Sequence, residues 1–253
     1  MAPPLAAAVG GPLGPLGLPR LAVALDGASL EPLETLIDAL AGLPVLAKVG
    51  MSLFSAVGPS VVHHLRAAGL AVYLDLNLCD IPHQVGQAID NIARLGVELV
   101  SVHACGGRAM LESAQRAARG RVRVLGTTVL TSIDAAAWAD SGQQGDLQQA
   151  VAQQLRLVAD CGLAGAVLAA EDLPLAAELP ASFLRVTPGI RPIAAQPVGA
   201  GRIDDQRRTA TAEAALRAGA SILVVGRPLL GSSEPRDAVL RLLQQIDQAP
   251  DRI

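Results

Sequence analysis

Aromatic side chains are scarce in this chain of 253 residues, which has two phenylalanines, one tyrosine and one tryptophan. So few rings exclude a protein that stacks nucleic-acid bases on an aromatic platform. The net charge of -3 also excludes a strongly basic surface for nucleic acid. We therefore expect no nucleic-acid partner and a core built from aliphatic side chains.

Cysteines and long apolar runs are also few. The three cysteines, Cys79, Cys105 and Cys161, form no CxxC pair, which argues against a zinc framework and a disulfide scaffold. Free thiols favour a reducing compartment. No unbroken apolar run reaches the roughly 18 residues that suggest a membrane-spanning helix. The sequence therefore predicts a cytoplasmic protein with no membrane partner and no metal site.

The N-terminal end differs from the rest in composition. Residues 1–19 contain no charged side chain and are interrupted by five prolines and four glycines. A secretory signal peptide carries positive charge near its start, so this segment does not resemble one. We expect a flexible tail over residues 1–19 and a single domain over residues 20–253.

Short aliphatic runs recur along that domain, and each is followed by a stretch with helical spacing of apolar residues. The runs are Leu21–Asp26, Val45–Gly50, Val72–Leu76, Leu99–Ala104, Val122–Thr131, Gly165–Ala170, Phe183–Ile190 and Ser221–Arg227. The helical stretches include Pro59–Ala68, Ile81–Leu95, Leu147–Cys161, Thr209–Ala218 and Glu234–Ile246. Strands that alternate with helices form parallel sheets. Eight such units in about 230 residues predict an α/β protein with a single closed (β/α)8 TIM barrel.

An open, doubly wound sheet is the alternative architecture for this pattern. In its dinucleotide-binding form, a GxGxxG motif follows the first strand directly. Here Asp26-Gly27-Ala28-Ser29 follows instead, so the barrel is favoured.

Polar residues stand at the ends of the apolar strands, where barrels of this kind carry their functional groups. They are Asp26, Lys48, Asp75, Asn77, His103, Thr131, Thr187 and Arg227. A polar side chain inside an apolar strand costs free energy unless it is paired, so a single one is most simply a satisfied core residue. A ring of them at matching strand ends indicates a functional site.

Lys48 is the only lysine, and arginine supplies all the other basic residues. An ammonium group inside an apolar strand needs a carboxylate, which Asp26 or Asp75 can supply. The alternative is a structural ion pair in the barrel core.

Positive charge gathers in the second half of the chain. Residues 191–227 include six arginines and three acidic residues. Within this segment, Val225-Gly226-Arg227-Pro228 ends the last strand, and the loops after strands seven and eight of such barrels commonly bind phosphate. Glycine lets a backbone N–H approach an oxyanion, which arginine binds bidentately. We expect a phosphate site with residues 192–205 as a lid, and a solvated surface cluster is the alternative.

In combination, these segments resemble the orotidine 5'-phosphate decarboxylase family over about residues 20–230. Residues 75–82, Asp-Leu-Asn-Leu-Cys-Asp-Ile-Pro, resemble the family signature D-x-K-x-x-D-I-P. The other matching segments are Leu25-Asp26, Lys48-Val49-Gly50, Val102-His103-Ala104, Val129-Leu130-Thr131-Ser132, Thr187-Pro188-Gly189-Ile190-Arg191, Asp205-Gln206 and Val225-Gly226-Arg227. Each is short, and their order along the chain makes the resemblance specific.

The resemblance implies a cofactor-free reaction in which orotidine 5'-monophosphate loses CO2 to give UMP, in a homodimer with composite sites. It implies that Asp26 and Lys48 hold the ribose and that Asp75 faces the substrate carboxylate. Asp80 would reach the ribose bound in the neighbouring subunit. The other implied contacts are Thr131 with the pyrimidine, Gln206 with base and phosphate, and Arg191, Gly226 and Arg227 with phosphate.

The chain departs from the signature at the proton-donating lysine, because that position is Asn77. With Lys48, Asp75 and Asp80, it would complete the catalytic group, but an amide carries no positive charge and is not a useful acid. His83 is an alternative donor. The residues after Ile-Pro also differ from the family pattern, at the substrate contact expected of Gln84.

Three functions are compatible with these residues. The first is decarboxylation of orotidine 5'-monophosphate, impaired by Asn77 or supported by a rearranged acid. The second is a non-catalytic homologue that binds UMP or a similar nucleotide. The third is a related enzyme acting on a phosphorylated sugar, in which the pyrimidine contacts would be idle. A carboxylate facing the substrate carboxylate, Asp75, favours the first.

Overall fold

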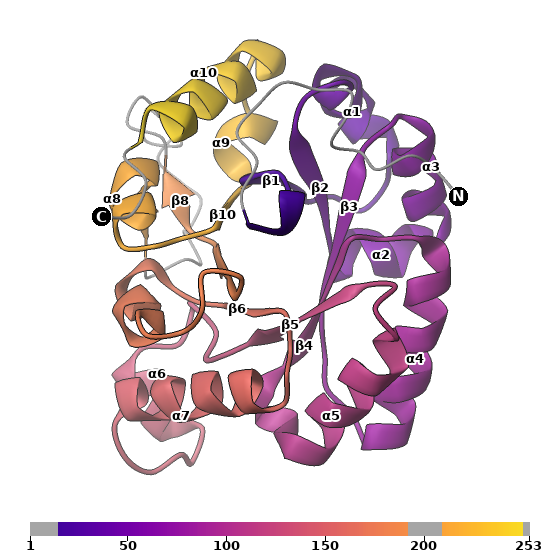
Figure 1. Cartoon of the computed structure of the whole chain (residues 1–253). Coiled ribbons are helices and arrows are strands. Elements are labelled where there is room, and N and C mark those ends of the chain that lie inside the picture. The colour runs from indigo at the N-terminus through magenta and orange to yellow at the C-terminus, as the bar shows by residue number, and fades with distance from the viewer. Residues whose placement is uncertain (1–14, 192–208, 250–253) are drawn as a thin grey trace.

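The protein is a closed barrel of eight parallel strands surrounded by helices (Figure 1). The structure, a computed structural model, describes residues 15–191 and 209–249. In barrel order the strands are β1 (Leu21–Leu25), β10 (Ile222–Val225), β7 (Leu184–Thr187), β6 (Gly165–Val167), β5 (Arg123–Thr127), β4 (Leu99–His103), β3 (Ala71–Leu78) and β2 (Val45–Gly50). The predicted TIM barrel is therefore confirmed, and the open sheet is excluded.

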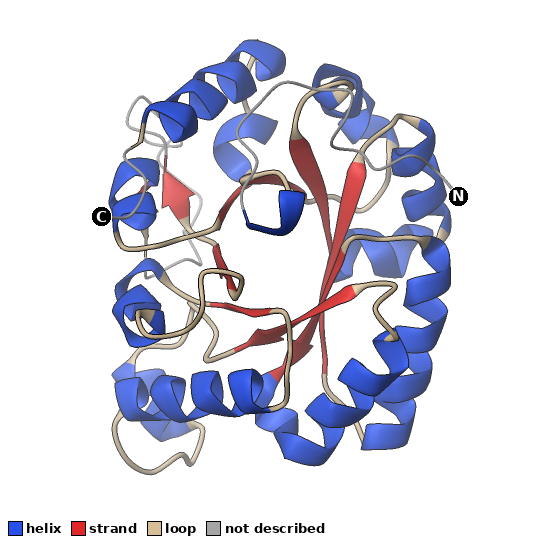
Figure 2. Ribbon diagram, in the orientation of Figure 1, coloured by secondary structure: helices blue, strands red, loops and turns tan. Residues whose placement is uncertain are grey.

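Helices form the outer layer of the barrel, as Figure 2 shows. They are α1 (Glu34–Leu40), α2 (Met51–Val57), α3 (Ser60–Ala67), α4 (Pro82–Leu95), α5 (Gly107–Ala118), α6 (Ala135–Asp140), α7 (Leu147–Asp160), α8 (Ala212–Arg217), α9 (Arg227–Leu230) and α10 (Pro235–Gln248). None of the helices within the described residues is long and apolar enough to cross a membrane.

Helix α4 illustrates why these segments are helical. Pro82 stands at its first turn, where the missing N–H costs nothing. Its buried residues Val85, Ile89 and Ile92 recur at helical spacing and pack on the barrel. Gly96 ends it in the left-handed conformation, with φ of 75°. The helix turns the chain back beside β3 and places its own N-terminus at the carboxyl ends of the strands.

The core has two layers that follow the two-residue period of the strands. In β2, Leu46 belongs to the cluster inside the barrel, whereas Val45 and Val49 belong to the cluster under the helices. By the same alternation Lys48 faces the interior. Leu18, from the segment expected to be a tail, is buried in the inner cluster, and residues 1–14 lie outside the described part of the chain.

Several strand boundaries differ from the sequence-based expectation; the sixth strand, for example, was expected to reach Ala170 but ends at Val167, and the fifth and seventh bear on the site. The fifth strand was expected to reach Thr131 but ends at Thr127. The seventh was expected to reach Ile190 but ends at Thr187, and Ile190–Arg191 instead forms β8. This short strand pairs with β9 (Ala210–Thr211) as a separate two-stranded sheet. In both places the apolar run continues past the barrel wall, so hydrophobicity alone does not locate the strand end.

Candidate active site

A bulge in β3 carries the central residues of the site. Leu74 pairs with Val100 and Leu78 pairs with Val102, so three residues of β3 lie opposite Ser101 alone. Asn77, inside the bulge, has a positive φ of 48°, a conformation that asparagine tolerates better than most residues. The bulge releases residues 75–77 from the regular ladder with β4, while Asp75 still pairs with Gly50 of β2.

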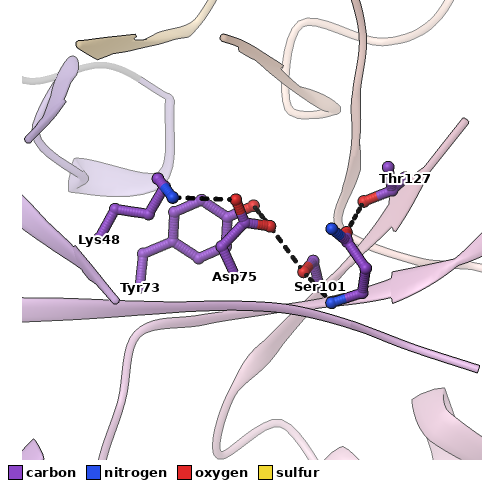
Figure 3. Close-up of polar contacts among 6 residues, drawn as sticks. Lys48, Tyr73, Asp75, Ser101 and Thr127 are labelled. Atoms are coloured by element: carbon purple, nitrogen blue, oxygen red, sulfur yellow. Dashed lines mark hydrogen bonds and ion pairs between the residues drawn. The ribbon is translucent and has the colours of Figure 1, made fainter. Parts of the chain in front are cut away.

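The carboxylate of Asp75 accepts from three neighbours (Figure 3). Lys48 Nζ lies 3.2 Å from its Oδ2. Tyr73 Oη lies 3.0 Å and Ser101 Oγ lies 2.8 Å from its Oδ1, and both hydroxyls donate. A carboxylate held by one cation and two hydroxyls has a fixed direction.

Tyr73 is held in its neutral form by this arrangement. Its side chain is almost fully buried inside the barrel, with 1% of its surface exposed. Burial, together with the charge of Asp75, raises its pKa well above the ordinary value of a phenol. The hydroxyl therefore stays a donor to Asp75 at physiological pH.

Asn77 is also tied into the network, by two neighbouring strands. Its backbone N–H donates to Ser101 Oγ at 2.9 Å, which replaces a ladder hydrogen bond lost in the bulge. Its side-chain Oδ1 accepts from Thr127 Oγ1 at 2.5 Å. The amide NH2 group is then the part of Asn77 that can address a substrate, as a neutral donor.

The surroundings of Gly50 and Gly226 show that Asp26 lies close to both Lys48 and the end of the last strand. A Cβ atom on Gly50 would lie 3.6 Å from Lys48 Nζ and 3.7 Å from Asp26 Oδ1. A Cβ atom on Gly226 would lie 3.3 Å from Asp26 Oδ2. Asp26 directly follows β1, and β1 lies between β2 and β10. The carboxylate of Asp26 therefore stands between the ammonium group of Lys48 and Gly226 of the expected phosphate site. The lone lysine, Asp26 and Asp75 thus converge at one mouth of the barrel.

The expected phosphate-binding residues occupy the same side of the barrel. Gly226 follows β10, and Arg227 is the first residue of α9 rather than the last of the strand. Arg191 ends β8 and is partly buried. Gln206 and the expected lid, residues 192–205, lie outside the described residues.

Other expected residues stand apart from the Asp75 network. Asp80 is exposed, and its Oδ1 accepts from the N–H of Ile81 at 2.6 Å. His83 and Gln84 are exposed on the first turn of α4. Thr131 lies in the turn after β5, so Thr127 takes the place at the strand end that the sequence assigned to Thr131.

One residue of the expected ring faces the wrong way. Leu184 and Val186 of β7 belong to the cluster inside the barrel. Thr187 alternates with them and therefore faces the helices. It is fully buried, and its hydroxyl has no hydrogen-bond partner among the described residues. Thr187 is therefore not part of the site.

The sequence did not identify three members of the network. Tyr73, Ser101 and Thr127 lie inside predicted strands, and none of them was named as a candidate site residue. The signal for Ser101 and Thr127 was their position, because each stands two residues after an inward-facing leucine, Leu99 or Leu125, and so shares its face.

Two polar features lie just outside the network. Burial lowers the pKa of His103, the last residue of β4, below the ordinary value of histidine. The sulfur atoms of Cys79 and Cys105 are 3.7 Å apart. Among the described residues, no group of three or more His, Cys, Asp or Glu side chains is placed to hold a metal ion.

Comparisons with known proteins agree with this geometry. Residues 19–242 match the model of the family described as orotidine 5'-phosphate decarboxylase / HUMPS. Orotidine 5'-phosphate decarboxylase of Halorhodospira halophila is 42% identical over 237 residues, which cover 92% of this chain and 98% of the relative. That of Nitrosospira multiformis is 38% identical over 235 residues, 92% of this chain and 96% of the relative. The crystal structure of orotidine 5'-phosphate decarboxylase from Lactobacillus acidophilus has a TM-score of 0.77 and 28% identity, covering 90% of this chain and 99% of the other.

Proposed function

The chain belongs to the orotidine 5'-phosphate decarboxylase / HUMPS family, and from this premise we propose how its own residues carry out the reaction. The protein is a decarboxylase of pyrimidine biosynthesis that converts orotidine 5'-monophosphate to UMP. The observation that supports our assignment of the site is the Lys48–Asp75 ion pair inside the barrel mouth, at 3.2 Å. A nucleotide-binding homologue without catalysis would have no use for a fixed carboxylate there.

Asp75 destabilises the bound substrate. Tyr73 and Ser101 fix its carboxylate, so it cannot turn away from the carboxylate of orotidine 5'-monophosphate. At 4 Å and an effective dielectric constant near 20, the repulsion between the two charges is about 4 kcal/mol. Loss of CO2 removes that repulsion. Binding energy from the distant phosphate offsets its cost in the substrate complex.

Lys48 supplies the proton. When CO2 leaves, the electron pair of the broken C–C bond stays on the pyrimidine carbon, which then takes a proton. Asn77 cannot give one, and arginine is too weak an acid. Burial keeps His103 neutral by lowering its pKa, whereas the pKa of Tyr73 is raised well above its ordinary value. Lys48 has three N–H groups, which allow it to bind Asp75, contact the ribose and face the carbon.

Asn77 and Thr127 have a positioning role in this proposal. Thr127 holds the amide oxygen, so the amide NH2 group points to the substrate as a neutral donor. This neutral group replaces a cation beside the developing negative charge, which predicts a slower enzyme than one with lysine at this position.

The nucleotide is held at both ends of the same mouth. Asp26 accepts from the ribose hydroxyls beside Lys48. The N–H of Gly226 and the guanidinium groups of Arg191 and Arg227 bind the phosphate. Thr131 contacts the pyrimidine, as the family resemblance implies. Gln206, which the resemblance assigns to both base and phosphate, lies outside the described residues.

We propose a homodimer in which Asp80 completes the neighbouring site. Its exposed position, next to the 63% exposed Ile81, fits a contact outside its own barrel. Mixing inactive Asp80→Asn subunits with inactive Asp75→Asn subunits is expected to restore about a quarter of the wild-type activity, through hybrid dimers with one intact site. Absence of recovery in hybrids that do form would exclude this arrangement.

A cytoplasmic location is part of the same proposal. The three cysteines are all free thiols, as expected for a reducing compartment. Cell fractionation followed by immunodetection tests it, and recovery of the protein outside the cytoplasmic fraction would contradict it.

The decisive experiment follows orotidine 5'-monophosphate consumption by ultraviolet absorbance. The wild-type protein is expected to produce UMP, and Asp75→Asn is expected to lose turnover while it binds the substrate more tightly, because the repulsion is gone. Calorimetric binding of UMP is the control for an intact site. If neither the wild-type protein nor Asn77→Lys turns over substrate while both bind UMP, the decarboxylase assignment is wrong.

A further inference from the structure

Two thiols meet at the mouth of the barrel, on neighbouring strands. Cys79 directly follows β3, and Cys105 lies in the short 3-10 helix Ala104–Gly106 that follows β4. Their Sγ atoms are 3.7 Å apart, and both residues are exposed. The third cysteine, Cys161, is buried and contacts Arg108 instead. The first two therefore form a pair that an external reagent can reach.

We propose that Cys79 and Cys105 form a dithiol site that closes reversibly to a disulfide by exchange with low-molecular-weight disulfides. In the first step the Cys79 thiolate attacks the external disulfide, which releases one thiol and leaves a mixed disulfide. In the second step the Cys105 sulfur attacks Cys79 Sγ and displaces the second thiol. Two protein thiols are oxidised, one external disulfide is reduced, and the two protons leave with the released thiols.

The local environment sets the order of these steps. Burial and the neighbouring Cys79 raise the pKa of Cys105 to about 11, so Cys105 is the poorer nucleophile while Cys79 is free. Once Cys79 is in a mixed disulfide, its thiol no longer contributes to the raised pKa of Cys105, although the contribution of burial remains. The second step is then intramolecular between atoms that are already neighbours, which favours it over a second external attack.

Closing the bond constrains a segment that lies beside catalytic residues. A disulfide bond is about 2.0 Å long, so the two sulfurs must approach from 3.7 Å by about 1.7 Å. Cys79 lies between Asn77 and Asp80, and the N–H of Cys105 donates to His103 Nδ1 at 3.2 Å. Resting on the proposed function, we expect the disulfide to lower kcat on the order of tenfold or more, because small misplacements of catalytic groups have effects of this size.

The site is tested by thiol titration of the full chain after incubation in glutathione buffers of graded redox ratio. Denatured reduced protein has three reactive thiols, and the oxidised protein is expected to have one, with a peptide that joins Cys79 to Cys105 in mass spectrometry. Cys161→Ser is the matched control and should form the same bond. Cys105→Ser should stop at the mixed disulfide with glutathione.

Two outcomes would overturn the proposal. One is three free thiols at the most oxidising ratio, and the other is glutathione on both cysteines with no bond between them. A second probe, a trivalent phenylarsenical, should bind wild type tightly and bind Cys79→Ser and Cys105→Ser at least tenfold more weakly, since it needs both thiols. These readouts do not require turnover, so their failure is distinguishable from failure of the decarboxylase assignment. The effect on kcat is measured separately, with restoration by dithiothreitol and an unresponsive Cys105→Ser.

Discussion

Lys48→Arg, made alone and together with Asn77→Lys, separates a proton donor from a cation that only binds. In the wild-type protein Lys48 Nζ lies 3.2 Å from Asp75 Oδ2. Arginine at this position keeps a positive charge beside Asp75 but is too weak an acid to protonate carbon. General acid catalysis contributes about 10²–10⁴ in rate. We therefore expect Lys48→Arg to lower kcat by about 10²–10⁴, which is roughly 3–5 kcal/mol in the activation barrier.

The second background supplies another ammonium group. Asn77→Lys is expected to raise kcat at least about tenfold, through a second acid and a cation beside the developing negative charge. In the Asn77→Lys background, Lys48→Arg should lower kcat by no more than about tenfold. The two substitutions then couple by about 1.4 kcal/mol or more, well above the error of a double-mutant cycle.

Asn77→Lys also has a structural cost. Asn77 has a φ of 48°, and its side-chain oxygen accepts a hydrogen bond from Thr127. Left-handed backbone costs most L-residues about 1–2 kcal/mol, and the lost hydrogen bond costs about 1 kcal/mol. We expect the free energy of unfolding to fall by roughly 2–3 kcal/mol in urea denaturation while activity rises.

The assay is the absorbance change of orotidine 5'-monophosphate under saturating substrate, with UMP affinity by calorimetry for each variant. If Lys48→Arg lowers kcat by the same factor in both backgrounds, Lys48 is a binding or positioning cation and not the acid. If the Asn77→Lys protein does not fold, a second experiment replaces the double-mutant cycle. Added ethylammonium is then expected to restore part of the kcat that Lys48→Ala loses. Rescue by guanidinium to the same extent would then contradict proton donation.

Three further predictions concern the surroundings of the site. Tyr73→Phe removes a buried donor to Asp75 and should lower the free energy of unfolding in urea by about 1.5–3 kcal/mol; an unchanged value would show that the hydrogen bond contributes nothing net. Arg227→Ala should weaken UMP binding in calorimetry by roughly 1.5–3 kcal/mol, and unchanged affinity would remove it from the phosphate site. Burial lowers the pKa of His103, so the unfolded chain binds this proton more readily, and the free energy of unfolding should fall as pH drops below about 6.5. In urea titrations across that pH range, the free energy of unfolding of His103→Gln should depend less on pH than that of the wild-type protein. If the two proteins show the same pH dependence, other groups cause it.

The sequence predicted what depends on local periodicity and left out what depends on neighbouring strands. Lys48 and Asp75 could be placed inside the barrel because the two-residue period and the strand ends are readable along one chain segment. The bulge could not, since it arises from a mismatch in register between β3 and β4. Thr127 was missed for a related reason.

The run after β5 explains that error. Val129 is buried although it lies beyond the strand, so the apolar segment is longer than its hydrogen-bonded part. The strand end is set by pairing with β4 and β6, which stops at Thr127 on both sides. Hydrophobicity indicates which residues are buried, and after β5 the buried residues continue beyond the last residue that pairs with a neighbouring strand.

The bulge has a consequence for how this enzyme can change over evolutionary time. Three consecutive positions of β3 lie opposite a single residue of the neighbouring strand, and two of them, Asp75 and Asn77, belong to the site, whereas Leu76 packs in the core under the helices. A mutation there alters the reactive groups while the ladder on either side keeps its register. Inheritance of the scaffold and variation of the chemistry are thus uncoupled at this point.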